Sequence, residues 1–169
     1  MNVNTEVIRR LRDSLLLRER TAQPDVAPIT GAQKQGAPRD ALLRRIEPFA
    51  ETMYLVMMAD AESAEVERRA LLGALSVLTD GTVDPAELNC MIDRFDAGTA
   101  REGSEARLQQ IGMHFASERE DRETAFTLAA VVAVADGRVE PGENRALEWV
   151  QEYFGVSDRR AQILLESID

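Results

Sequence analysis

The 169-residue sequence predicts an all-α protein, a single globular bundle of about seven to eight helices. Apolar residues recur at helical spacing in nearly every segment, and no segment alternates between apolar and polar residues as a strand does. Ala, Leu and Val are plentiful while aromatic residues make up only 5% of the chain, a balance that favours helix over sheet. A motif that recurs between the predicted helices further indicates repeated helical hairpins built with one type of turn.

The chain begins with an amphipathic segment, residues 1–20, which predicts an Arg-rich helix. Its apolar residues recur every four positions, at Val3, Val7, Leu11 and Leu15. Residues 21–38 contain three prolines and two glycines and predict a linker. We therefore expect a detachable arm in front of an all-helical domain that spans residues 39–169.

The first half of this domain predicts three helices. Residues 42–59 form an apolar segment in which Pro48 marks a kink or a new first turn. A second helix over residues 66–77 ends at Thr79-Asp80-Gly81. Asp84, Pro85 and Glu87 then carry the signature of a helix start, with an N-cap, a proline at the first position and a capping-box glutamate. Residues 96–103, which include two glycines, are expected to form a loop.

The second half predicts four more helices. Leu108 and Phe115 belong to the apolar face of the first of them. Residues 125–135 have one polar member, Thr127, and predict the central buried helix. Gly155 ends the next amphipathic helix. Ser157-Asp158 begins the last helix, whose inward residues are expected to be Ile163, Leu164 and Ile168.

The formal net charge of −10 is unevenly distributed. Residues 1–45 carry an excess of four positive charges, and the remainder carries an excess of fourteen negative charges. An acidic body repels phosphate backbones, which argues against a nucleic-acid partner. Basic proteins and metal cations suit it better.

Several classes of protein are disfavoured by what the sequence contains. Cys90 is the single cysteine and predicts a buried or half-buried thiol in a reducing compartment. His114 is the single histidine, so a Cys/His zinc site or a histidine-based catalytic pair is not expected, and we predict no enzyme activity. No signal peptide and no apolar run of membrane-spanning length occurs, so we expect a soluble, cytoplasmic protein.

Three turns share one spacing, an Asp at the end of an apolar run and a Glu seven residues later. The pairs are Asp60 and Glu67, Asp80 and Glu87, and Asp136 and Glu143. A carboxylate at the C-terminal end of a helix opposes the helix dipole, and carboxylates with free carbonyl oxygens are the ligands that Ca²⁺ or Mg²⁺ prefers. If the hairpins converge, a divalent cation would relieve the repulsion between these groups.

A purely structural interpretation of the same turns also stands. Gly supplies the positive φ of a helix-ending turn, the Glu completes a capping box, and Val83 and Val139 plug the turn against the core. An EF-hand is excluded for the Asp80 turn, because two of its ligand positions would be Ser76 and Leu78.

Two of these motifs resemble a known family. The segments Met57-Met58-Ala59-Asp60 with Glu67, Val134–Glu143, and Tyr153-Phe154-Gly155-Val156-Ser157 are similar to those of TerB-like domains, the tellurite resistance TerB and DjlA N-terminal-like domains. The likeness covers roughly Phe49 to Ile168. It implies an all-helical fold with two pseudo-symmetric halves, a role in stress responses and membrane-associated or chaperone-like assemblies, and no defined reaction.

The resemblance also implies a metal site formed by Asp60, Glu67, Asp136 and Glu143. Ala61 and Ser63 replace the Gly and Val usual in the first motif, so either Asp60 binds within an altered turn or Asp80 and Glu87 share in the site. The cation would be Ca²⁺ or Mg²⁺, and no other cofactor is implied.

Two functions remain open. The first is a cation-responsive module that presents a face to a protein partner, and the second is a metal-free helical scaffold whose acidic surface recruits a basic protein. For the N-terminal helix, we expect docking on the acidic body of the same chain or contact within a homodimer; attachment to an anionic membrane surface is a less favoured alternative.

Overall fold

The computed structural model describes residues 4–22, 37–59, 64–135 and 141–168 of the chain. These ranges contain eight helices and no strand, so the predicted all-α bundle is confirmed; the pseudo-two-fold relation between its halves stays a prediction. The helices are α1 (Thr5–Ala22), α2 (Ala37–Met57), α3 (Ala64–Leu78), α4 (Pro85–Glu102), α5 (Ser104–His114), α6 (Arg119–Ala133), α7 (Pro141–Tyr153) and α8 (Asp158–Glu166). No helix in the described ranges combines the length and the apolar content needed to cross a membrane.

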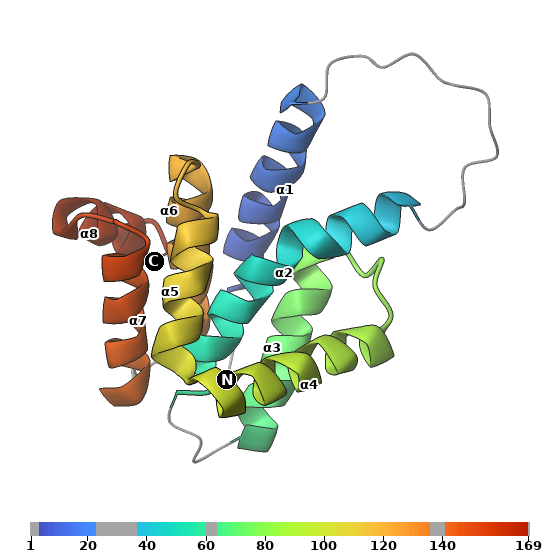
Figure 1. Cartoon of the computed structure of the whole chain (residues 1–169). Coiled ribbons are helices and arrows are strands. Elements are labelled where there is room, and N and C mark those ends of the chain that lie inside the picture. Colours follow the sequence, from blue (N-terminus) through green and yellow to red (C-terminus); the bar gives the residue numbers. More distant parts are fainter. Residues whose placement is uncertain (1–3, 23–36, 60–63, 136–140, 169) are drawn as a thin grey trace.

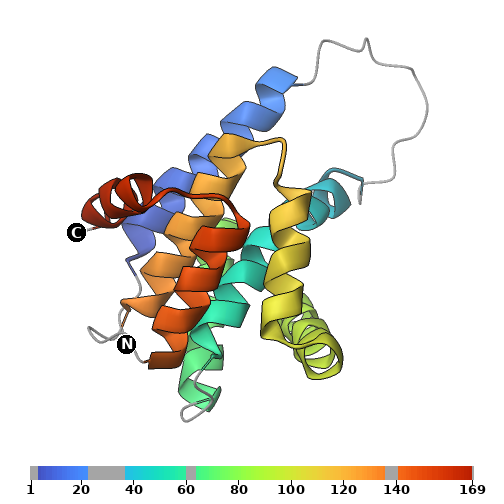
Figure 2. The same cartoon turned by 60° about the vertical axis from the view of Figure 1, so that its left-hand side comes forward.

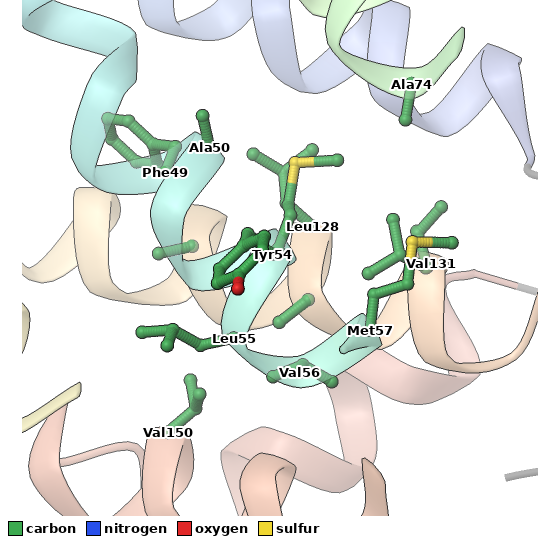
Figure 3. Close-up of a cluster of buried hydrophobic side chains, with 14 of the residues drawn as sticks. Phe49, Ala50, Tyr54, Leu55, Val56, Met57, Ala74, Leu128, Val131 and Val150 are labelled. Atoms are coloured by element: carbon green, nitrogen blue, oxygen red, sulfur yellow. The ribbon is translucent and has the colours of Figure 1, made fainter. Parts of the chain in front are cut away.

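The centre of the bundle is formed by α2 and α6, which pack together more extensively than any other pair of helices in the described ranges. Figure 1 shows α2 running through the middle of the molecule. Every residue of α6 from Ala125 to Ala133 is at most 2% exposed, which confirms the prediction of a central buried helix. Figure 3 shows Leu55 and Met57 of α2 among Leu128 and Val131 of α6 and Val150 of α7. Burying each large apolar side chain stabilises the fold by roughly 1.5–3 kcal/mol.

A close approach of two backbones joins α5 to α7. A Cβ atom at Gly112 would lie 2.5 Å from the carbonyl oxygen of Tyr153, so no larger residue fits there without displacing α7. Beside this contact, the rings of Phe49 and Phe115 lie 4.8 Å apart, and those of Phe115 and Phe154 lie 5.7 Å apart. Such pairs add stability beyond the area that they bury.

The predicted loop over residues 96–103 is wrong, because α4 continues to Glu102. Glycine inside a helix costs only about 1 kcal/mol, and Gly98 is buried against its neighbours, so it does not end the helix. The break comes at Gly103, whose φ of 85° only glycine adopts readily. Of the two alternatives at Pro48, the structure has the kink and not a new first turn. Pro48 lies inside the single helix α2, which changes direction along its length (Figure 1).

Two side chains lie differently from their predictions. Cys90 is exposed, because its position on α4 faces away from the stripe of Leu88, Met91 and Ile92 that packs into the core. Ile163 is 44% exposed, whereas Ala161 and Ile168 are buried. The short helix α8 therefore buries a narrower face than its apolar residues suggest.

Helix α1 packs against α3 and α6 of its own chain, which is the first of the three alternatives for this helix. The alternatives that involve a second copy or a membrane stay predictions, as do the boundaries of the arm, linker and domain.

Candidate functional site

The candidate site lies at the end of the bundle where α3 and α7 begin (Figures 1 and 2). A pocket of about 590 Å³ is lined there by Ala59, which follows α2, and by Gly142, in the first turn of α7. Asp60 directly follows Ala59, and Glu143 directly follows Gly142. The chain next to the first and third acidic motifs therefore meets at one pocket.

The second member of each of these two motifs lies near the start of a helix. Glu67 lies in the first turn of α3 and Glu143 in the first turn of α7, where the helix dipole favours a carboxylate. Glu143 is only 6% exposed, and Glu67 is half-buried. Because a carboxylate is costly to bury, each of the two must be stabilised by hydrogen bonds, by a positively charged side chain or by a bound metal cation.

The first members of the motifs, Asp60 and Asp136, lie outside the described residues, as does Val139. Among the residues that the structure describes, no three Asp, Glu, His or Cys side chains gather closely enough to hold a metal ion. A site made of Asp60, Glu67, Asp136 and Glu143 therefore stays a prediction.

The turn at Asp80 is described in full. Asp80 and Gly81 have φ values of 54° and 67°, so both residues adopt the left-handed conformation that ends α3. Asp is among the few residues other than Gly that tolerate it. Val83 is 2% exposed, which confirms its predicted role as a plug.

Arginines engage the two motif carboxylates of this turn. Asp80 Oδ1 accepts a hydrogen bond of 2.5 Å from Arg12 of α1, and Glu87 pairs with Arg39 of α2. The predicted capping box is therefore formed only in part, since Asp84 accepts a hydrogen bond from the Ala86 amide while Glu87 turns to Arg39. A role of Asp80 and Glu87 in metal binding remains a prediction, and the arginines give both residues a structural role.

A family model described as "Tellurite resistance protein TerB" matches residues 48–165, well over half of the chain. The chain belongs to the TerB family. The matched range agrees with the resemblance over Phe49 to Ile168, which is thereby confirmed. No curated protein and no solved structure matches the sequence.

Within this TerB domain, the pocket has a lining that the motifs did not predict. Trp149 of α7 lies on it, with the guanidinium of Arg145 at 5.3 Å from the ring centroid, a cation–π contact. Glu102 and Glu105 also line it, where α4 passes into α5. Arg145 and Trp149 are four residues apart on the helix that follows the third motif, and this spacing was the available signal.

The two glutamates differ in their partners. Hydrogen bonds from Arg101, Gln110 and Arg107 lower the pKa of Glu102 to about 2. The hydroxyl of Tyr153 donates to Glu105, and this hydrogen bond to the carboxylate raises the pKa of Tyr153 to about 12. Glu102 therefore stays ionised over the physiological pH range, with its charge balanced by Arg101 and Arg107.

Proposed function

We propose that this TerB-family protein is a non-enzymatic, acidic helical module that binds a divalent cation and presents a face to a protein partner, in a bacterial stress or tellurite-resistance-type assembly. One observation supports the cation site above the others. Ala59 and Gly142, the residues next to Asp60 and Glu143, line the same pocket. The residues that flank the acidic turns of the α2–α3 and α6–α7 hairpins thus lie at one pocket.

The proposed ligands are Asp60, Glu67, Asp136 and Glu143. Carboxylate and carbonyl oxygens suit Ca²⁺ or Mg²⁺, which would offset both the mutual repulsion of the carboxylates and their unfavourable placement at helix C-termini. Because the ion would join two hairpins, its binding would stiffen this end of the bundle. A partner that recognises the stiffened form would then respond to the cation.

The alternative is a metal-free scaffold that recruits a basic protein, and the Asp80 turn favours it. There the motif carboxylates are balanced by Arg12 and Arg39 of the same chain, without an ion. The excess of acidic residues outside the N-terminal region would attract a basic partner.

A thermal melt separates the two functions. The melting temperature is measured in EDTA and then in excess Ca²⁺ or Mg²⁺. At an ion concentration of about 100 times Kd, binding stabilises the native state by about 2.7 kcal/mol, a rise of roughly 5–11 °C for a chain of this size.

Two variants test the assignment of ligands. Glu143→Gln and Asp136→Ala should abolish the ion-dependent rise, because each removes a proposed ligand. Glu148→Gln, an exposed change on the same helix, is the matched control and should retain it. Equal midpoints of the wild-type protein with and without ions would leave only the metal-free scaffold.

A further inference from the structure

Helix α1 covers a face of the TerB domain that α3 and α6 form (Figures 1 and 2). Among its described residues, the apolar contact consists of three core residues and the partly buried Leu11. Val7, Ile8 and Leu15 are its only residues under 9% exposed among those whose burial is described, and Leu17 is 63% exposed. By contrast, α6 buries an unbroken run of nine residues.

Arginines supply much of the remaining contact. Arg12 donates to the Val77 carbonyl and to Asp80 at the end of α3. One turn and a half further on, Arg18 donates to Glu120, Asp121 and Thr124 at the start of α6. Both guanidinium groups thus bind a face that offers carboxylates and a helix-end carbonyl oxygen, the chemistry that arginine prefers.

Helix α1 lies outside the range that the TerB family model matches. The matched residues 48–165 contain α3 and α6 but not α1, which is joined to α2 through residues 23–36. The face beneath α1 therefore lies within the matched range, whereas α1 itself lies before it.

We propose that the face of α3 and α6 beneath α1 is a docking site for an arginine-bearing amphipathic helix of a partner protein, and that α1 is its exchangeable occupant in cis. This inference rests on the proposed role as an interaction module and names the chemistry of the partner. Tethering gives α1 an effective concentration that is roughly millimolar. The α1 helix of a second copy would make the same contacts, but without the effective concentration that the tether provides. A helix of a partner protein could compete with the tethered α1 if a fuller apolar stripe gave it a higher affinity for the face.

The test separates α1 from its tether in the full-length protein. A protease site is inserted between Gln23 and Gly36, and a fluorescein-labelled peptide of residues 4–22 is added before and after cleavage. After cleavage, the labelled peptide should replace α1 with a stoichiometry of one per chain, measured by anisotropy. In the uncleaved protein its apparent affinity should be at least tenfold weaker.

Two unlabelled competitor peptides check the chemistry of recognition. The Arg18→Glu peptide should compete at least tenfold less well, because it loses the contacts with α6. The Arg9→Glu peptide carries the same change of charge at an exposed position and should compete like the native peptide. Equal competition by both would contradict recognition through Arg18.

Three outcomes would overturn the proposal. They are unfolding of the cleaved protein, failure of the labelled peptide to enter it, and hydrogen exchange in intact α1 that occurs only through global unfolding. If the intact protein has the mass of a dimer in solution, and Arg18→Glu restores the mass of a monomer, the face binds α1 of a second copy. This result would contradict the proposal of a different partner protein. None of these measurements needs a divalent ion, so the proposed cation site fails or stands independently of this one.

Discussion

Helix α6 meets two neighbours in contrasting ways. Against α2 it presents mostly apolar side chains, among them Leu128 and Val131, which Figure 3 shows in close packing. Asp121 in its first turn is a charged exception that pairs with Arg45 of α2. Against α1 it presents the carboxylates of Glu120 and Asp121, which bind Arg18. The first contact depends on exclusion of water and holds the fold together. The second depends on charge, contributes less and responds to pH and salt, which suits a contact that can be exchanged.

The largest effect is expected from Leu128→Ala on the α2 side. Leu128 is fully buried, so its truncation leaves a cavity and should lower the free energy of unfolding by about 3 kcal/mol, within the usual range of roughly 2–5. Urea denaturation measures the loss, which should be the same at low and high salt. Val134→Ala, at a position that is 40% exposed just after α6, is the control and should cost less than about 1 kcal/mol. Equal losses at the two positions would contradict the assigned core.

A smaller effect is expected from Asp121→Asn on the α1 side. The side chain of Asp121 is 3% exposed and pairs with both Arg18 and Arg45, so the change removes the negative charge that the two guanidinium groups share, although Arg18 keeps its pair with Glu120. Because both arginines retain some exposure, we expect a loss of about 1–2 kcal/mol, below the roughly 3–5 typical of a fully buried pair. The exposed Glu120→Gln should cost less than about 0.5 kcal/mol in the same urea titration. A loss at Asp121 no larger than this would show that the contact is only superficial.

The smallest effect concerns pH and the contact of α6 with α8. Hydrogen bonds from Arg160 and Arg119 hold the pKa of Glu123 below its usual value of 4.5. A carboxylate with a lowered pKa stabilises the folded state above its unfolded pKa and loses that contribution as the pH falls through the folded value. Wild-type protein should therefore exceed Glu123→Gln in stability by a few tenths to about 1 kcal/mol at pH 7. Urea titrations at several pH values below 4.5 should show this difference shrinking, and a constant difference would contradict the assignment.

The helices were predictable because a helix that is buried on one face has apolar residues spaced at about 3.6 positions along the sequence. The nine-residue buried run within α6, apolar except for Thr127, identifies a central helix without reference to any neighbour. The end of α4 was not predictable in this way, since Gly98 and Gly103 look alike in sequence. Only the packing around Gly98 and the φ of Gly103 separate an interior glycine from a terminating one.

The candidate site was predictable only as a set of turns. Motif spacing places Asp80 correctly in the turn after α3 and Glu87 in the first turn of α4, but it cannot indicate which distant side chains meet them. Arg12 and Arg39 reach this turn from α1 and α2, through contacts that depend on tertiary packing. The same limit applies to Trp149, which lines the pocket beside Ala59 because α7 packs against α2 and α5.

The position of Trp149 has a practical consequence. It is the only tryptophan of the chain, so fluorescence that is excited selectively at the tryptophan absorption edge comes from this one side chain. This side chain lies at the pocket where α2 ends and α7 begins. Its emission spectrum therefore gives an unlabelled, site-specific record of rearrangement at this end of the molecule in the native protein.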